Sequence, residues 1–166
     1  MRASLLLLDS YHLDELCFSM NEKYVYDDDQ AKEPILTAED LSIEAEPWRH
    51  PEEPLKWFFR LSVRLNNKNA KFPYDFSIKL TGFFNVKKEC PPDFAEQLAL
   101  VNAPAILYAS ARELLAMVSG RSIFVSVILP SITFFDPPKP KSEEPKRQKA
   151  LPGKSPSKAR KTALKK

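Results

Sequence analysis

The chain has 166 residues with fifteen prolines, only three glycines, two cysteines and a formal net charge of +3. This length fits one domain, because single cores stop growing at roughly 250 to 300 residues. The apolar run in residues 1–8 is too short for a secretion signal, and no stretch approaches the ~20 apolar residues of a membrane span. We therefore expect a cytosolic protein without membrane insertion.

Alternating apolar and polar residues between positions 5 and 86 predict an antiparallel sheet with one buried face. In the first strand the apolar phase changes between Leu13 and Leu16, which predicts a bulge near Asp14 and Glu15. A short strand over 41–46 is expected to end at Pro47, because proline removes a donor from the ladder.

The two clearest strands are the segments 55–65 and 74–86, in which every second residue is apolar. The polar, asparagine-rich segment 66–69 between them tolerates left-handed backbone and reads as a hairpin loop. We expect these two strands to pair as neighbours, giving four strands in total.

Helical spacing of apolar residues begins at Leu107 and predicts one main helix of about 16 residues. Asn102 is the expected N-cap, Pro104 lies in the first turn, and Gly120 is the expected left-handed stop. The fold class is therefore α+β, a four-stranded antiparallel sheet with one main helix packed on one side. One helix leaves many large aromatic residues uncovered, which favours an oligomer.

Residues 136–166 differ from the rest of the chain in composition. They hold eleven basic residues against three acidic ones, so this tail carries +8 and residues 1–135 carry −5. Its many prolines, lysines and serines cannot bury enough surface to offset the entropy of ordering. We expect a folded domain over 1–135 and a disordered basic tail over 136–166.

The sequence offers no catalytic set. His12 and His50 lack partners at ligand spacing, and motifs of nucleophile elbows and phosphate loops are absent. The acidic run 27–29 lacks the glycine and the distal glutamate of a calcium loop. We expect no enzyme activity, no metal site and no cofactor.

Aromatic residues occupy positions where the strand pattern calls for polar ones. Phe58 and Phe83 break the polar phase of their strands, and Trp48 lies in a proline-rich segment. Two interpretations remain open: these rings pack under loops or a neighbouring subunit, or they line an apolar groove for ligands.

Three segments in order, Leu80-Thr81-Gly82-Phe83-Phe84-Asn85-Val86, then residues 101–113 and 129–134, resemble the SecB family of protein-export chaperones. The early segment 16–19 resembles the first strand of that family, so the resemblance extends over residues 9–135. It implies a SecB-like fold assembled as a dimer of dimers, a homotetramer. It also implies ATP-independent binding of unfolded or pre-export polypeptides in apolar grooves, a holdase function.

On this basis two sets of residues receive candidate roles. The candidate client-binding residues are Trp48, Phe58, Phe83, Tyr108, Ile123 and Phe124. The candidate oligomer interface consists of Ala105, Ala109, Arg112 and Ala116, since small residues on one side of the helix let a second helix approach closely.

Three departures from the family pattern are visible. The sequence after Phe135 lacks the second helix that family members usually have. Glu15 and Asp75 match acidic positions that dock to the export translocase motor, but Ser19 and Ser77 replace others. A basic tail stands where a neutral or acidic end is usual, and atypical family members include chaperones dedicated to antitoxins.

The competing hypothesis is nucleic-acid or ribosome binding through the tail, whose cations would release counterions from phosphates. The candidate polyanion-binding residues are Lys154, Lys158, Arg160, Lys161, Lys165 and Lys166. The acidic body does not provide a basic readout surface of its own.

Overall fold

The computed structural model describes residues 3–25, 35–124 and 126–135. Four strands form one antiparallel sheet in the order β1-β4-β3-β2. The elements are β1 (Leu6–Met20), β2 (Leu41–Arg49), β3 (Lys56–Leu65), β4 (Tyr74–Val86) and the helix α1 (Pro92–Ser119), with short 3-10 turns at Ala38–Asp40 and Lys68–Ala70. The predicted α+β architecture is confirmed. The acidic run 27–29 and the tail 136–166 lie outside the described residues.

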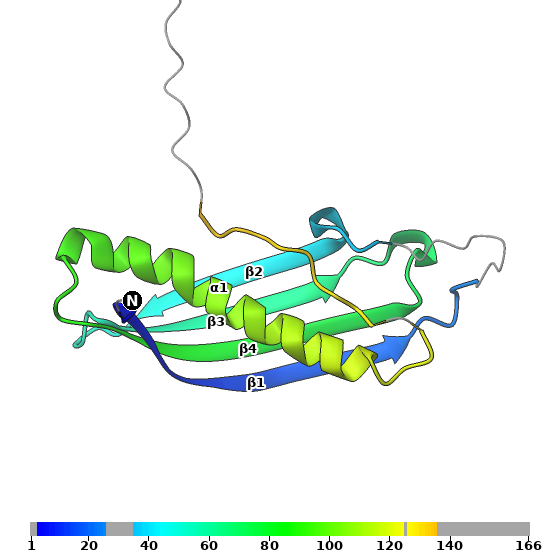
Figure 1. Ribbon diagram of the computed structural model, residues 1–166, viewed down its shortest axis with the longest axis horizontal. Helices are drawn as coiled ribbons and strands as arrows, with labels where there is room; N and C mark the ends of the chain where they lie inside the picture. Colours follow the sequence, from blue (N-terminus) through cyan, green and yellow to red (C-terminus); the bar gives the residue numbers. More distant parts are fainter. Residues whose placement is uncertain (1–2, 26–34, 125, 136–166) are drawn as a thin grey trace, which may run out of the picture. The chain divides into compact units, whose positions relative to one another are not determined.

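One face of the sheet carries the core. In β3 and β4 every second side chain is buried, and Phe59, Leu61 and Leu80 have exposed fractions of 1% or less. Helix α1 lies across this inner face, as Figure 1 shows, and contacts β1, β3 and β4. We call the opposite, helix-free side of the sheet the outer face.

The helix begins eleven residues earlier than the predicted N-cap Asn102 implies and is 28 residues long. Most of its buried residues form a row at every fourth position, a ridge against the sheet, with Pro104 and Tyr108 buried beside it. The row consists of Ala95, Ala99, Ala103, Leu107, Ala111, Leu115 and Ser119. Alanines dominate its first half, so the large apolar side chains that reveal a helix in the sequence begin only at Leu107.

Three local predictions around the helix are wrong. Asn102 is not the N-cap, because it lies inside the helix and its side-chain amide donates to the carbonyl of Leu98 at 2.9 Å. Pro104 is likewise in the interior, buried against the core, instead of in the first turn. Gly120 has φ −63° and ψ −8°, which is right-handed backbone, so the helix ends without a left-handed residue.

The helix lies close to the sheet at Gly82 in β4. A Cβ atom at this position would lie 2.7 Å from Cδ2 of Leu107 and 2.8 Å from the Phe84 ring. Real carbon atoms do not approach this closely, so only glycine leaves room for the helix here.

The predicted bulge in β1 is confirmed. The register with β4 shifts between Leu13 and Glu15, leaving Asp14 without an opposite residue, and shifts again between Leu8 and Ser10. A bulge adds a residue to one strand and bends it.

Strand β2 does not end at Pro47, as the sequence predicted, but continues to Arg49. Backbone groups of successive residues point to alternate edges of a strand. The amide of His50 donates to Lys56 in β3 at 3.0 Å, so the amide position of Pro47, three residues earlier, faces the free edge of the sheet. Proline costs no ladder hydrogen bond there.

The loop between β3 and β4 is organised by one asparagine side chain. Asn67 accepts from the amide of Phe72 and donates to the carbonyls of Phe72 and Tyr74, each at 3.0 Å. The left-handed residue of this loop is Ala70, with φ 52°, and not one of the asparagines. Nearby, the Lys71 ammonium lies 2.8 Å from Asp40, and its hydrogen bond, together with those from the hydroxyl and amide of Thr37, lowers the pKa of that carboxyl to about 2.

The first prediction concerns this loop. Asn67→Ala removes three hydrogen bonds to half-buried backbone groups, which we expect to lower the free energy of unfolding by about 1–3 kcal/mol. The neighbouring Asn66→Ala is the matched control, because no hydrogen bond is recorded for that exposed side chain. Urea unfolding followed by circular dichroism measures both, and equal midpoints for the two variants would contradict the role of Asn67.

Candidate functional site

The outer face carries a row of aromatic side chains that crosses three strands. Trp48 in β2 lies opposite Phe58 in β3, which lies opposite Phe83 in β4. The first two rings stack with centroids 4.8 Å apart and planes 6° apart, and the Phe58 and Phe83 centroids are 6.1 Å apart. We call Trp48, Phe58 and Phe83 the aromatic row.

Charged and polar neighbours flank the aromatic row. The Arg60 guanidinium lies 5.4 Å from the centre of the Trp48 ring, a cation–π contact, and the His12 ring meets Phe83 edge-on at 5.8 Å. Phe83 keeps 41% of its surface exposed. The three rings are therefore fixed by one another while Phe83 still presents apolar surface on the outer face.

An open pocket of about 490 Å³ lies next to the aromatic row on the outer face. It is lined by charged residues of both signs. Its lining residues are Asp14, Glu15, Glu44, Glu46, Arg60, Ser62, Arg64 and Lys79. Lys79 donates to Glu15 at 2.5 Å, and this hydrogen bond with its accompanying charge attraction lowers the pKa of Glu15. Asp14, at the bulge, accepts from the Thr81 hydroxyl at 2.6 Å.

The two residues predicted to dock to a translocase motor both lie on this face. Asp75 lies opposite Ser19 and is exposed, whereas Glu15 is opposite Lys79 and paired with it. The carboxylate of Glu15 is thus partly neutralised within the chain.

The six predicted client-binding residues do not form one surface. Trp48, Phe58 and Phe83 come together on the outer face. Tyr108 lies in the core at 5% exposure, and its hydroxyl donates to the carbonyl of Pro130 at 2.8 Å.

The other two residues follow the end of α1. Phe124 is half-buried, and its ring lies roughly perpendicular to those of Tyr24 and Tyr74, with ring centres 5.8 and 5.7 Å away. Ile123 is 80% exposed in the turn. Helical spacing places Tyr108 next to Leu107 in the buried part of α1, where the sequence pattern does not distinguish it from a core residue.

The predicted interface residues of α1 are also divided. Ala105 and Ala109 are exposed, and Ala116 is half-buried. Arg112 is used within the chain, where its guanidinium donates twice to the carbonyl of Leu129, at 2.8 and 2.6 Å. It holds the extended segment 126–135 beside the helix, with Leu129 completely buried.

A second apolar surface, which the sequence analysis did not single out, lies along β1. Leu8, Tyr11, Leu13 and Met20 occupy the positions of β1 on the inner side of the sheet, yet between 36% and 51% of each side chain is exposed. We call these four residues the β1 belt. Strand position alone predicts burial, yet these four side chains keep a large part of their surface exposed.

Within the described part of the chain, no helix combines the length and apolarity needed to cross a membrane. The tail lysines and arginines named above lie outside the described residues, so their role stays a prediction.

Comparison with protein families gives no matching family model. Over 94 residues the chain is 31% identical to the uncharacterized protein MJ0357 of Methanocaldococcus jannaschii, covering 55% of this chain and 60% of that protein. The match thus spans less than two thirds of that relative's length.

Among solved structures, the Mycobacterium tuberculosis SecB-like chaperone Rv1957, in complex with a ChAD peptide from the Rv1956 HigA1 antitoxin, aligns with a TM-score of 0.54. The alignment has 14% identity and covers 76% of this chain and 90% of that one. The fold is therefore SecB-like. A Streptococcus agalactiae protein of unknown function gives a TM-score of 0.42 at 11% identity, covering 78% of this chain and 100% of that one, too low to indicate a shared fold.

The second prediction tests the pairing of Glu15 with Lys79. Lys79→Gln removes the cation, so we expect the pKa of Glu15 to rise toward the ordinary range of a glutamate. Carboxyl chemical shifts in an NMR pH titration measure this. Glu53, whose pKa is lowered by Lys56, is the internal control and should not move. An unchanged pKa at Glu15 would show that the ion pair does not form in solution.

Proposed function

We propose that this chain is an ATP-independent holdase chaperone that binds non-native polypeptides through the aromatic row on its outer face. The observation that supports this most strongly is the row itself: three large aromatic side chains meet on the side of the sheet that α1 does not cover. A sheet face in contact with water normally carries polar residues. The position of these aromatic rings therefore favours a role in ligand binding over a role in stabilising the fold.

The chemistry of the row suits clients of varied sequence. Aromatic rings offer large contact area and make no demand for a particular hydrogen-bonding partner. An unfolded chain exposes apolar side chains at many places, so several weak contacts add up through linkage. Binding of this kind requires no bond to be made or broken, and we propose no enzyme activity and no cofactor.

Support also comes from the fold. The Mycobacterium tuberculosis chaperone with the similar fold is described with a bound antitoxin peptide. This favours a polypeptide partner for the present chain and supports a client-dedicated role, of the antitoxin type, as a narrower form of the same function. We place the protein in the cytoplasm, where such clients are synthesised.

The β1 belt supports self-association as part of the proposal. Burying four exposed apolar side chains along one strand would gain roughly 25 cal/mol for each square ångström removed from water. We propose that two chains associate through the β1 belt and that two such pairs, held by Ala105 and Ala109, give a dimer of dimers.

Docking to an export motor has less support. The pairing of Glu15 with Lys79 removes one of the two candidate acids, which leaves Asp75 alone. For the tail we propose an accessory, salt-sensitive contact with nucleic acid or the ribosome, because its lysines and arginines would release counterions from phosphates. As a principal function, nucleic-acid binding has no comparable support from the body of the protein.

The third prediction tests the aromatic row. Phe58→Asp places a charge between Trp48 and Phe83, so we expect client binding to weaken by about 1–2 kcal/mol, roughly tenfold in affinity. Light scattering from a denatured client, without nucleotide, measures suppression of aggregation. Val25→Asp is the matched control, because Val25 is 82% exposed and distant in sequence from the row. If wild-type protein leaves client scattering unchanged, the holdase function is excluded.

The fourth prediction tests the β1 belt. We expect the wild-type protein to sediment as a dimer or tetramer at micromolar concentration, and Leu13→Glu to shift it to lower mass, because a charge in an apolar interface is costly to desolvate. Leu7→Glu is the control, since Leu7 is an equally exposed leucine of β1 on the outer face. A wild-type monomer would remove the belt from the proposed function.

A further inference from the structure

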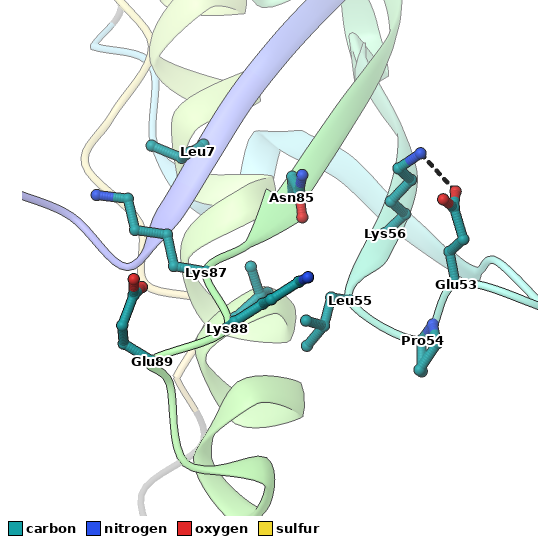
Figure 2. Close-up of a pocket in the computed structure, with 10 residues that line it drawn as sticks. Leu7, Glu53, Pro54, Leu55, Lys56, Asn85, Lys87, Lys88 and Glu89 are labelled. Atoms are coloured by element: carbon teal, nitrogen blue, oxygen red, sulfur yellow. Dashed lines mark ion pairs between the residues drawn. The ribbon is translucent and has the colours of Figure 1, made fainter.

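A second pocket lies at the end of the sheet where β4 ends and β3 begins. It is open, has a volume of about 650 Å³, and combines apolar residues with lysines (Figure 2). It is lined by Leu7, Glu53, Pro54, Leu55, Lys56, Asn85, Val86, Lys87, Lys88 and Glu89. We call it the lysine pocket.

Two of its three lysines are available to bind an anionic group of a ligand. Lys56 forms an ion pair with Glu53, drawn as a dashed line in Figure 2. In the described part of the chain, neither Lys87 nor Lys88 has a carboxylate within 4.0 Å of its ammonium group. Leu7, 40% exposed, lies in the same pocket. Glu53 and Glu89 line the same pocket, so its three lysines leave an excess of one positive charge next to apolar surface.

The lysine pocket adjoins the aromatic row. In the sheet register Leu7, Asn85 and Lys56 lie opposite one another. Asn85 is two residues from Phe83 along β4, and Lys56 is two residues from Phe58 along β3. Two residues of a strand span about 7 Å. A single extended segment lying on the outer face can thus contact both, with side chains two or three residues apart.

We infer that the lysine pocket binds a carboxylate side chain of the client, so the preferred client segment has apolar or aromatic residues with a glutamate or aspartate two or three positions away. This inference rests on the proposed function, because it places the client on the aromatic row. The pocket of about 490 Å³ on the other side of the aromatic row holds Asp14, Glu15, Glu44 and Glu46 beside its three basic residues, so it offers no excess of positive charge. The acidic residue of the client therefore has one preferred position.

A phosphate of a single-stranded nucleic acid is the other anion that lysines beside aromatic rings could bind. Two features of the outer face favour the carboxylate. Trp48 stacks on Phe58, which takes up ring faces that bases would need. Glu44 and Glu46, exposed in the same strand as Trp48, would repel a phosphate backbone that continued along the sheet.

The experiment uses the full-length protein and three labelled peptides with one centre, Phe-Leu-Phe-Leu, flanked on both sides by Glu-Glu, Gln-Gln or Lys-Lys. Fluorescence anisotropy at low ionic strength measures their affinities. We expect the Glu peptide to bind about fivefold more tightly than the Gln peptide, and the Lys peptide most weakly, with the differences shrinking as salt is added.

Paired variants identify the pocket as the cause. Lys87→Gln with Lys88→Gln should abolish the preference for the Glu peptide while affinity for the Gln peptide stays the same. Lys23→Gln with Lys68→Gln, which removes the same charge from exposed lysines not in the lysine pocket, should keep the preference. A preference that survives in the Lys87/Lys88 variant would assign it to other cations, such as those of the tail, and overturn the inference.

The remaining outcomes separate the inference from the proposed function. Equal affinities for the three peptides, each weakened by Phe58→Ala, would overturn the inference and leave the holdase function standing. No binding of any peptide would overturn both. Tighter binding of a labelled oligouridine than of the Glu peptide, lost in the Lys87/Lys88 variant, would make the pocket a phosphate site and overturn the inference.

Discussion

The contact between α1 and strand β4 at Gly82 decides what each face of the sheet can do. Because glycine leaves no Cβ beneath Leu107, the alanine-rich ridge of the helix lies directly on the strands. This close approach buries the inner side chains of β3 and β4 and makes that side the core. Alternation then places Phe58 and Phe83, whose chain neighbours Phe59 and Phe84 are buried, on the outer face.

The narrowness of the helix has a second effect. A single helix contacts β1, β4 and β3 but cannot cover all seven inner positions of a fifteen-residue edge strand, so the β1 belt is left exposed. The proposed function assigns different roles to the two apolar surfaces: clients on the aromatic row, and a second copy of the chain on the belt. The opposite faces of one sheet can be occupied at the same time, so assembly and client binding need not compete.

Much of the fold could be predicted from the sequence because sheet burial has a period of two. The alternating residues of β3 and β4, and the phase change at Asp14, correctly give the strands, their pairing and the bulge. The first half of α1 could not be predicted, since its buried residues are alanines and carry no apolar signal. Pro104 and Asn102 then resembled a helix start, although tertiary packing keeps both inside the helix.

The candidate site was predicted only in part. Phe58 and Phe83 were found because they violate strand alternation, and Trp48 because it lies in a proline-rich segment. The structure shows that the three lie together. Tyr108 obeys the helical pattern of buried residues, so nothing in the sequence separated its role from that of a core residue. The lysine pocket escaped detection because its residues come from three separate segments, and only the strand register brings Leu7, Lys56 and Asn85 to the same level.

Pro47 has a consequence for how far sheets of this protein can grow. It faces the free edge of β2 and offers no amide to a strand arriving there, whereas β1, fifteen residues long, contains no proline. Edge-to-edge addition of further chains is thereby blocked on one side and open on the other. Two chains joined at their β1 edges would have no unblocked edge left, so such pairing closes on itself and cannot propagate into a fibre.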